Sequence, residues 1–462
     1  VRVPFRRTSA LATQFIQPSD QVGKPPRKNG QTTGQQVVGA GFAGLVAARM
    51  LSAYADQVIL LDRDTIPSGP TIRRGTPQAH HQHHLLPGGL AVLARWFPNL
   101  IARLDKLGGQ SAGPSEWYAY TPRGKTYRVS RFQPSPIAHR PPLRMQSRAL
   151  LEYCLRQDVE QLPNVTCRYD VAVDGVLWAQ RNVCGVTTSN GAKLSADLVI
   201  DASGRVSRTL GWLKQAGYAT PPASVVNCDF AYASMFFRPA DASAVDGTGF
   251  MVSSAQEGEY TKRGGSLVNI EDGRWLVTLA GRLGDYPPKD EEGFFAYVRT
   301  LHTPIMAELL AAAEPDSAPH QYRFPASVNR HYERLEAFPE GLLPVGDAIC
   351  HINPGYAQGM SYTCRQLEQL DQILRARKQE SRLRNLWPEF FACAYQQSRA
   401  PWLFAALVDF SKQGTTGDFP EHERPAITRL RHLSALADRG DAAAADLVDA
   451  VFDMERPLSA LL

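Results

Sequence analysis

The chain has 462 residues, 44% of them hydrophobic, which is enough for the core of two or three domains. No apolar run is long enough to cross a membrane. Seven scattered cysteines, an odd number with no C-x-x-C pair, suit a reducing compartment and predict neither a disulfide framework nor a zinc site. Six basic residues against one acidic residue at positions 1–36 account for the whole net charge of +5, so the neutral remainder indicates neither nucleic-acid binding nor a stable membrane association. We therefore expect a cytoplasmic protein.

Residues 1–35 are rich in Gln, Pro, Thr, Gly and basic residues, and they are predicted to form a disordered basic leader. Arg6 and Arg7 precede a short apolar segment, as in a twin-arginine signal or a transit peptide. That segment soon meets Pro18 and lacks a convincing cleavage site, which favours a dispensable leader over an export signal.

The run VVGAGFAGL at 37–45 predicts a strand, a tight turn and a helix. Gly39 permits the turn, Gly41 lets backbone N–H groups approach a pyrophosphate, and Gly44 lets helix and strand pack closely. A second apolar run ends in Asp62, which would bind ribose hydroxyls and repel a 2′-phosphate. The pattern predicts dinucleotide binding, and the alternative is a Gly-rich turn in an ordinary α/β unit. Gln35 and Gln36 stand where the first strand usually has apolar residues.

A polar loop rich in Pro and Gly is predicted at 63–89, and a loop of this length in a compact domain is usually functional. It carries Arg73 and four histidines, His80, His81, His83 and His84. No acidic or cysteine partner is spaced to complete a metal site, so we expect no metal. The loop is expected either to lie over a cofactor or to be solvated.

The remaining elements follow from periodicity and turn residues. Helices are predicted at 42–54, 90–107, 148–161 and 289–313, from Ser361, and from about Leu386 onward as a covering segment. Strands are predicted at 165–194 with turns at Asp174-Gly175 and Asn190-Gly191, in a buried strand at 197–201, and as an antiparallel sheet at 211–338 with a turn at Asp272-Gly273. The sheet at 211–338 suits the floor of a substrate pocket, although a structural sheet would have the same pattern. The stretch GLLPVGDAICHINPGYAQGM at 341–360 predicts a strand that ends at Gly346-Asp347, followed by a glycine-containing loop.

Three stretches together resemble the class A FAD-dependent monooxygenases, which have the glutathione-reductase-type FAD fold. They are VVGAGFAGL with Asp62, DLVIDASGRVSR at 197–208 and PVGDAICHINPGYAQGM at 344–360. The resemblance implies an α/β fold (α+β overall) with a discontinuous Rossmann-like FAD-binding domain at 36–210 and 339–385. An antiparallel-sheet substrate domain would be inserted at 211–338, and a C-terminal helical segment would cover 386–462.

A narrower similarity is to bacterial epoxidases that act on linear polyenes in polyether biosynthesis. The run TIRRGTPQAHHQHHLLPGG at 71–89, the hairpin IEDGRWLVTLAG at 270–281 and the segment at 324–342 carry this similarity. It implies epoxidation of an alkene or polyene in secondary metabolism, whereas the wider family resemblance leaves hydroxylation of an aromatic ring open.

The family resemblance also implies a set of FAD contacts. They are Gly39, Gly41, Phe42, Ala43, Gly44, Asp62, Arg63, Arg73, Arg148, Gly346, Asp347, Pro354, Gly355, Gly359 and Met360. Asp347 would bind the ribityl chain, while Gly355 and the backbone of Gly359 and Met360 would approach the flavin ring. A helix N-terminus near Ser361 would favour the negative charge of reduced FAD.

In the family, reduced FAD adds O₂ to give a flavin C4a-hydroperoxide, which would insert one oxygen atom into an apolar organic substrate. Ser203-Gly204 replaces the Asp-Gly pair that many aromatic hydroxylases link to NADPH. We therefore expect electrons from NAD(P)H to arrive through a separate flavin reductase or through NAD(P)H that binds only transiently. Spacing promotes no catalytic base among Tyr232, His302, Tyr322 and His331.

Three alternatives stay open. A flavin-dependent halogenase would share the first motif, but the W-x-W-x-I-P signature is missing. A prenyl-chain reductase of the geranylgeranyl type would carry FAD and a similar middle motif. An inactive flavin-holding relative is the non-enzymatic alternative.

Overall fold

The computed structural model describes residues 34–111, 117–120, 126–128, 144–241, 249–252, 263–378, 382–437 and 439–462. The predicted basic leader lies outside the described residues, except that Gly34 and Gln35 belong to the first strand. Residues 33–462 form one compact unit, and the predicted domain boundaries inside it stay predictions. Within the described ranges, no helix combines the length and apolarity that crossing a bilayer requires.

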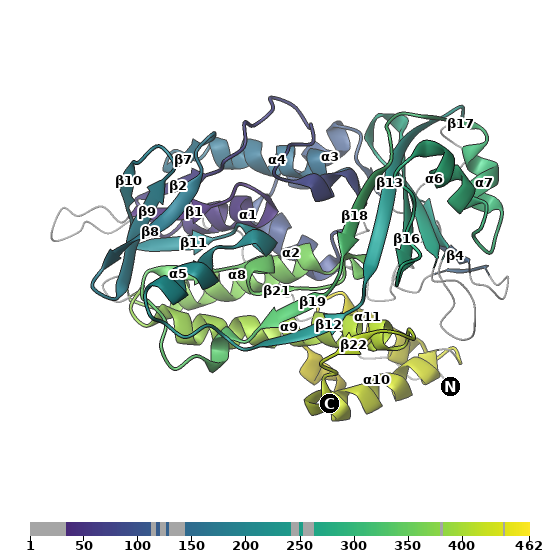
Figure 1. Ribbon diagram of the computed structural model, residues 1–462. Helices are drawn as coiled ribbons and strands as arrows, with labels where there is room; N and C mark the ends of the chain where they lie inside the picture. Colours follow the sequence, from purple (N-terminus) through teal and green to yellow (C-terminus); the bar gives the residue numbers. More distant parts are fainter. Residues whose placement is uncertain are drawn as a thin grey trace, which may run out of the picture. The chain divides into compact units, whose positions relative to one another are not determined.

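A five-stranded parallel sheet organises the first part of the fold (Figure 1). Its strands, in spatial order, are β20 (Leu342–Pro344), β11 (Leu198–Asp201), β1 (Gly34–Val38), β2 (Gln57–Leu61) and β7 (Val165–Arg168). Such sheets are covered on both faces, which explains the continuous apolar runs of β2 and β11. The carboxyl ends of four of these strands, β1, β2, β11 and β20, carry the motifs that the sequence singled out.

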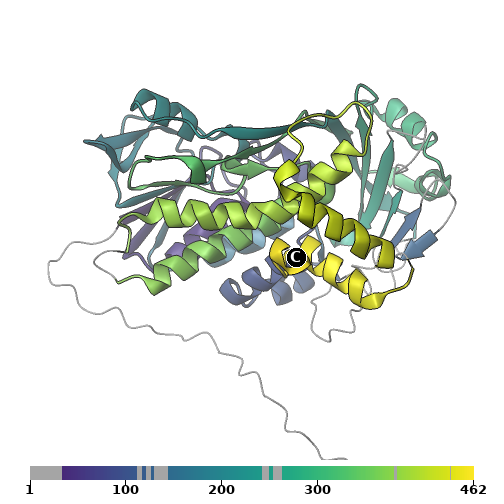
Figure 2. The same cartoon turned by 90° about the horizontal axis from the view of Figure 1, so that it is seen from below.

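Helices and a small sheet cover the parallel sheet (Figures 1 and 2). The helices α1 (Phe42–Leu51), α4 (Arg148–Glu160) and α8 (Gly359–Ala376) pack together around α1, and α9 (Leu386–Phe410) packs along α8. The strands β8 (Val173–Ala179), β9 (Asn182–Thr188) and β10 (Lys193–Ser195) form a separate antiparallel sheet, of which β9 contacts β11. Ser147 caps α4 by accepting a hydrogen bond from the N–H of Leu150, which places Arg148 at the first position of the helix.

The first strand forms although two glutamines replace the expected apolar residues. Gln35 and Gln36 are only 2% and 1% exposed, in register with β11 on one side and β2 on the other. The side-chain amide of Gln36 donates to the carbonyl of Ser195, but the side-chain oxygens of both glutamines have no partner within the described residues. The backbone hydrogen bonds to β2 and β11 and the two valines that follow therefore stabilise this strand.

The second large sheet is antiparallel in its main part. It comprises β17 (Ala313–Pro315), β13 (Phe230–Pro239), β16 (Trp275–Arg282), β15 (Gly264–Asn269), β14 (Gly249–Val252), β4 (Trp117–Tyr120) and β5 (Thr126–Arg128), with β18 (His320–Phe324) also paired to β13. The odd-numbered residues of β13, such as Met235 and Phe237, pack with α6 (Glu291–Val298) and α7 (Ile305–Leu310). Because side chains alternate along a strand, the even-numbered residues of β13 lie on the opposite face.

A third sheet links distant parts of the chain. Its order is β21 (Cys350–His351), β19 (Ser327–Arg330), β12 (Ala223–Asn227) and β22 (Thr416–Gly417). The helices α10 (Arg424–Ala437) and α11 (Ala442–Phe452) share a hydrophobic cluster with the end of α9. The predicted helical C-terminal segment is therefore present, and β22 ties it to the sheet region.

Two predicted helices are each divided in two. The single helix expected at 90–107 is α2 (Pro87–Trp96) followed by α3 (Leu100–Lys106), with Pro98 in the break. The helix expected at 289–313 is α6 followed by α7, and Pro304 precedes α7. Proline lacks an N–H group and restricts the conformation of the residue before it. The helical backbone is therefore interrupted at these positions, although the apolar spacing in the sequence continues past them.

Turn predictions were correct in two places and wrong in one. Asn190-Gly191 connects β9 to β10, and Asp272-Gly273 connects β15 to β16 with φ values of +64° and +63°. Asp174-Gly175, predicted as a turn, lies inside β8, where the register shift between Val173 and Gly175 marks a bulge. Glycine in a strand can mark a bulge as readily as a turn, and local sequence does not distinguish them.

Candidate functional site

The glycine motif makes the tight turn that the sequence predicts. Gly39 has a φ of +98°, and a Cβ atom there would lie 2.9 Å from the carbonyl oxygen of Ala202. A Cβ atom on Gly44 would lie 1.7 Å from the carbonyl oxygen of Gly39. Only glycine allows this close approach, and it sets the N-terminus of α1 at the carboxyl edge of β1, beside β11.

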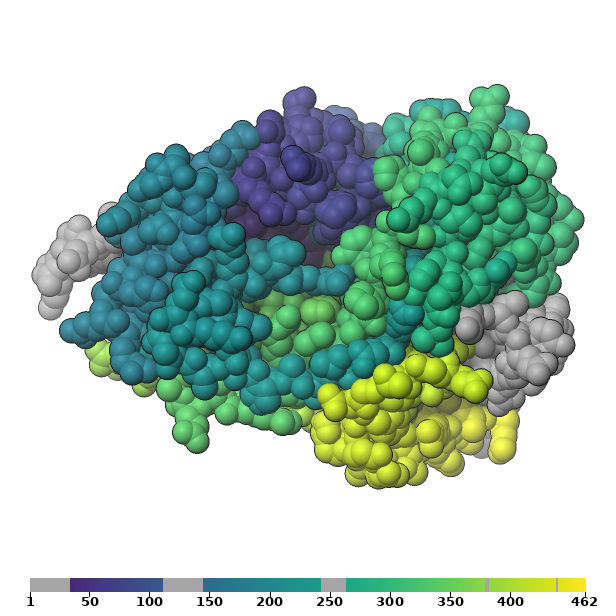
Figure 3. All heavy atoms as spheres, in the orientation of Figure 1, coloured from purple at the N-terminus to yellow at the C-terminus, as the bar shows by residue number. Residues whose placement is uncertain are grey.

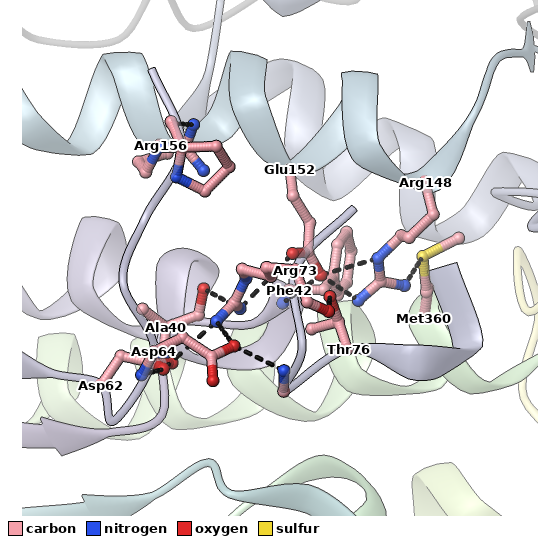
Figure 4. A network of polar contacts seen from close by, with 12 residues as sticks. Ala40, Phe42, Asp62, Asp64, Arg73, Thr76, Arg148, Glu152, Arg156 and Met360 are labelled. Carbon is pink, nitrogen blue, oxygen red and sulfur yellow. Dashed lines mark hydrogen bonds and ion pairs between the residues drawn. The ribbon is translucent and has the colours of Figure 1, made fainter. Parts of the chain in front are cut away.

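Asp62 and Arg73 form one side of a buried polar network next to this turn (Figure 4). Asp62 accepts hydrogen bonds from the backbone N–H groups of Ala40 at 2.5 Å and Asp64 at 2.9 Å. Arg73 Nη1 lies 3.2 Å from Asp62 Oδ1 and 3.1 Å from Asp64 Oδ2, and Nη2 donates to the carbonyl of Ala40 at 2.8 Å. The long loop therefore brings a buried cation to the glycine turn.

Glu152 and Arg148 of α4 form the other side of the network. Glu152 Oε1 accepts from the N–H of Phe42, the first residue of α1, at 3.2 Å. Arg148 donates to the same oxygen from Nε at 2.8 Å, and its Nη1 lies 2.7 Å from Met360 Sδ. A carboxylate thus lies at the N-terminus of α1, where the backbone N–H groups and the helix dipole favour an anion.

The network keeps Arg73 charged. Burial alone lowers the pKa of Arg73, but the carboxylates of Glu152, Asp62 and Asp64 outweigh that effect and raise it. The space beside Gly41 is open, because a Cβ atom built there would meet only Arg73 Nη2 at 3.8 Å and Glu152 Oε1 at 4.0 Å. Helix N–H groups, a glycine without a side chain and two arginines make a donor set that fits a pyrophosphate.

Asp347 occupies a second part of the site, after β20. It follows Gly346, whose φ is +60°, and its carboxylate has no hydrogen bond or ion pair with any described residue. Burial raises the pKa of this carboxyl group, although Arg205, Arg148 and Arg330 lower it in part. A Cβ atom on Gly359 would lie 3.9 Å from Asp347 Oδ1, so the carboxylate faces the N-terminus of α8. An acceptor without a protein partner fits the hydroxyls of a ribityl chain.

A buried cluster of polar side chains around Asp409 supports the turn at Pro354–Tyr356. Asn353 Oδ1 accepts from the N–H of Gly355 at 3.0 Å, and Asn353 Nδ2 donates to Asp409 Oδ1 at 3.0 Å. The same Asp409 oxygen accepts from Tyr356 Oη at 2.6 Å and from Arg282 Nη1 at 2.8 Å. Asp409 of α9 and Arg282 of β16 therefore fix this turn from two distant elements.

An aromatic face of the antiparallel sheet adjoins the same turn. We use "aromatic face" for Phe230, Tyr232, Tyr322 and Phe324, which lie opposite one another in the register of β13 and β18. The ring centroids of Tyr232 and Tyr322 are 5.6 Å apart, and those of Phe230 and Tyr232 are 5.7 Å apart. A Cβ atom on Gly355 would lie 3.4 Å from Phe230 Cζ, so the sheet and the Pro354–Tyr356 turn are in contact.

The long loop also packs on this sheet. His81 is only 3% exposed, its Nδ1 lies 2.8 Å from Ser234 Oγ, and its ring meets that of Tyr232 edge-on at 4.3 Å. Gln82 Nε2 donates to the carbonyls of Leu276 at 2.6 Å and Ser266 at 3.1 Å. This part of the loop is therefore anchored and not solvated.

The motif at 197–208 holds its own loop through hydrogen bonds to Asp201. Asp201 is fully buried and accepts from the Ser203 N–H at 3.1 Å and from the hydroxyls of Ser207 and Thr209 at 2.6 Å each. Ser203 Oγ also hydrogen-bonds to Asp201. The serine at the position that departs from the family pattern is thus engaged in holding its own loop.

The structure brings most of the predicted site residues together in these clusters. Ala43 joins them, because its Cβ would lie 3.6 Å from one built on Gly346. Arg63 does not join them, since it is exposed and has no hydrogen bond or ion pair with the described residues. His331 lies elsewhere, between Ser224 and Glu333, whereas Tyr232 and Tyr322 belong to the aromatic face. Whether the predicted contacts bind FAD stays a prediction.

Several residues of these clusters were given no site role by the sequence, among them Glu152, Arg282 and Asp409, and His81 was named only as one of four loop histidines. The spacing of Glu152 four residues after Arg148 is a helix-pair signal that could have drawn attention to it. No local pattern links Arg282 with Asp409. Within the described part of the chain, no group of three or more His, Cys, Asp or Glu residues could hold a metal ion.

Comparison with known proteins identifies the family and the fold. No family model matches the chain. Protein Rv3254 of Mycobacterium tuberculosis (strain ATCC 25618 / H37Rv) is 31% identical over 413 residues, which cover 84% of this chain and 83% of that protein. Solved structures with the same fold share far less sequence.

The flavin-dependent brominase Bmp2 has a TM-score of 0.61 at 14% identity, with 82% of this chain and 87% of the brominase covered. PqsL, a probable FAD-dependent monooxygenase from Pseudomonas aeruginosa, has a TM-score of 0.60 at 17% identity, with 82% and 98% covered. A flavoprotein/dehydrogenase from Cytophaga hutchinsonii has a TM-score of 0.62 at 17% identity, with 92% and 93% covered. The predicted fold is confirmed: the chain belongs to the family of protein Rv3254 and has the fold of the class A FAD-dependent monooxygenases.

Proposed function

We propose that the protein is an FAD-dependent monooxygenase that transfers one oxygen atom of O₂ to an apolar organic substrate. The reaction is epoxidation of an alkene or polyene, or hydroxylation of an aromatic ring, and we assign it to secondary metabolism. We use "cradle" for the N-terminus of α1 with Arg73, Arg148, Asp62 and Asp347, together with the Pro354–Met360 segment. The observation that carries the proposal is the contact between Gly355 and Phe230, since it joins this cradle to the aromatic face. Oxygen transfer needs such an arrangement, in which the substrate lies on an apolar surface beside the flavin.

Each part of the cradle would hold a different part of FAD. The N-terminus of α1 with Arg73 and Arg148 would bind the pyrophosphate, Asp62 the adenosine ribose, and Asp347 the ribityl chain. The Pro354–Met360 segment would lie against the ring. When bound and reduced, FAD reacts with O₂ and supplies the oxidising equivalent.

The chain's own residues would orient the flavin ring and shield the substrate from water. The exposed Pro354 and Gly355 leave room for a flat ring, and the N-terminus of α8 directs its partial positive charge to the same place. The aromatic face offers rigid apolar surface that excludes water from the substrate side. Electron-rich alkenes need no side-chain base for oxygen transfer, so epoxidation requires none, and no base is assigned for hydroxylation.

We place the electron source outside this chain, in a separate flavin reductase, or in NAD(P)H that binds only transiently. The support is the Asp201–Ser203 arrangement, in which the serine serves its own loop. Stopped-flow absorbance with NADPH alone tests this point. Rapid reduction of the bound FAD would contradict it.

The first test of the function is loading with FAD. The purified protein should be yellow with a flavin absorbance band, and with a reductase and O₂ it should give a product heavier by one oxygen atom. A colourless protein that ignores added FAD would overturn the proposal.

Halogenation is a second candidate, favoured by the fold that the chain shares with the brominase Bmp2. Mass spectrometry separates the candidates. A product that gains bromine in bromide buffer indicates halogenation, and a product that gains two hydrogen atoms indicates reduction of a prenyl chain.

A further inference from the structure

The aromatic face and the long loop that packs on it each carry one polar atom without a hydrogen-bond partner among the described residues. Tyr232 is 6% exposed and His81 is 3% exposed. Neither Tyr232 Oη nor His81 Nε2 has a hydrogen-bond partner within the described residues, and neither is sealed in the interior as the unpartnered hydroxyl of Tyr332 is. A nearly buried polar atom that still meets solvent is open to a ligand's polar group, because leaving it unpaired costs free energy.

The two atoms belong to one rigid unit. His81 packs edge-on against the Tyr232 ring at 4.3 Å, and its Nδ1 is held by Ser234 Oγ at 2.8 Å. Ser234 Oγ in turn lies 2.7 Å from Thr278 Oγ1 on the neighbouring strand. With Nδ1 committed to the sheet, the orientation of the imidazole is set and Nε2 is the atom left for a ligand.

The unit lies on the side of the sheet that faces the cradle. Tyr232 stands opposite Tyr322 in the register of β13 and β18, and Tyr322 Oη accepts from Arg205 Nη1 at 2.6 Å. Arg205 belongs to the middle motif at the end of β11. The Tyr232 ring also lies 5.7 Å from that of Phe230, which contacts Gly355 in the segment predicted to approach the flavin. In the space-filling view, the molecule is hollowed between the purple segment and the green and teal segments that face it (Figure 3).

Both groups are uncharged at physiological pH. Burial lowers the pKa of His81 to about 2, with smaller contributions from His83, His80 and His320. Burial and the neighbouring Tyr322 raise the pKa of Tyr232. A neutral imidazole and a neutral phenol can hydrogen-bond a neutral group, but neither compensates a charge on a ligand.

We propose that Tyr232 Oη and His81 Nε2 form the polar end of the substrate site, and that the substrate is an unsaturated or aromatic compound bearing an uncharged hydroxyl or carbonyl group. This inference rests on the proposed function and narrows it. A pure hydrocarbon would leave both atoms unpaired, and a carboxylate would meet no counter-charge from them. Tyr232 and His81 therefore determine substrate specificity by holding the polar group while the aromatic face holds the unsaturated part.

The experiment uses the FAD-loaded protein and matched pairs of probes. Naphthol is compared with naphthalene, geraniol with myrcene, and naphthoate serves as the charged analogue. Binding is followed by the change in FAD absorbance and by the rise in Tm. For the wild-type protein, we expect the alcohol of each pair to bind more tightly than its hydrocarbon, and naphthol to bind more tightly than naphthoate.

Two variants test the contribution of each atom to substrate binding separately. Tyr232→Phe removes only the hydroxyl and should reduce the preference for the alcohols by about three- to tenfold, with FAD affinity unchanged. His81→Asn keeps an amide near the Nδ1 position for Ser234, removes Nε2 and should have a similar effect. Tyr332→Phe is the matched control, because its hydroxyl is also unpartnered but is sealed in the core.

The outcomes separate this inference from the proposed function. A protein that loads FAD but shows no preference for either alcohol, or keeps its preference in Tyr232→Phe, overturns the inference alone. A Tyr232→Phe variant that binds FAD more weakly, with its probe preference unchanged, also overturns it, because Tyr232 would then be a cofactor contact. A protein that does not bind FAD overturns the proposed function together with this inference.

Discussion

The carboxylate of Glu152 accepts a hydrogen bond from the backbone N–H of Phe42 at 3.2 Å, at the first residue of α1. This N–H is one of the groups that the glycine turn directs at a dinucleotide pyrophosphate. Arg73 and Arg148 approach the same carboxylate from both sides (Figure 4). Glu152 therefore competes with a phosphate for the same donors.

Replacing Glu152 by glutamine should strengthen FAD binding. Glu152→Gln keeps the shape of the side chain, removes the negative charge and leaves Arg73 and Arg148 with more positive charge for a phosphate. We expect the Kd for FAD to fall by about three- to tenfold, since charged hydrogen bonds contribute roughly 1 kcal/mol more than neutral ones. Quenching of FAD fluorescence measures this Kd. Glu160→Gln, on the same helix but paired with Arg156 and Tyr169, is the control and should change nothing; weaker binding by Glu152→Gln would contradict the prediction.

Asp347→Asn should have opposite effects on FAD binding and on stability. Burial raises the pKa of Asp347, and no described residue pairs with its carboxylate, so the neutral amide should leave Tm unchanged or raise it. The same change removes a charged acceptor for hydroxyl groups, so the Kd for FAD should rise by about tenfold. Scanning fluorimetry and FAD titration test the two effects. A loss of stability with FAD affinity unchanged would show that Asp347 has a structural role instead.

The buried pair of Arg282 and Asp409 should show strong coupling. Asp409→Ala leaves Arg282 buried without its counter-charge and should cost about 3–5 kcal/mol in the free energy of unfolding. The double variant with Arg282→Met should cost less than the sum of the single changes, because it removes both charges. Urea denaturation measures these values. Glu421→Ala, which breaks the exposed pair with Arg424, should cost less than about 1 kcal/mol; equal costs for the two sites, or additivity at the buried one, would refute the coupling.

Stability should fall as the pH decreases below about 6.5. Burial lowers the pKa of His81 to about 2, whereas the unfolded chain has the ordinary histidine value, so the unfolded state binds more protons in this pH range. The contribution of His81 is complete above the unfolded pKa and is lost at about 1.4 kcal/mol for each pH unit below it. His81→Asn should therefore flatten the dependence of unfolding free energy on pH between about 6.5 and 5. Parallel profiles for wild type and variant would show that His81 can take up a proton in the folded state.

Local patterns determined much of the fold. The glycine spacing predicted the turn before α1, and the structure shows that a Cβ atom on Gly44 would lie 1.7 Å from the backbone. Strand alternation predicted the antiparallel sheet, and the turns at 190–191 and 272–273 lie where the sequence placed them. These features depend on steric limits within a few residues, which a single sequence displays directly.

Other features were decided only by tertiary structure. The helices predicted at 90–107 and 289–313 are each divided, because prolines interrupt the backbone where the apolar pattern continues. Gln35 and Gln36 form a buried strand because the ladders to β2 and β11 outweigh their side-chain preferences. The sequence could not show which residues distant contacts would bring to the site.

The glycines and Asp62 thus indicated a nucleotide site from the sequence alone, because the turn and the strand end that position them are local. The meeting of Glu152 with Phe42, of His81 with Tyr232, and of Arg282 with Asp409 was decided by packing. Each pair joins two elements that are separate in the chain. A buried polar group must find a partner, but which partner it finds depends on the fold that closes around it.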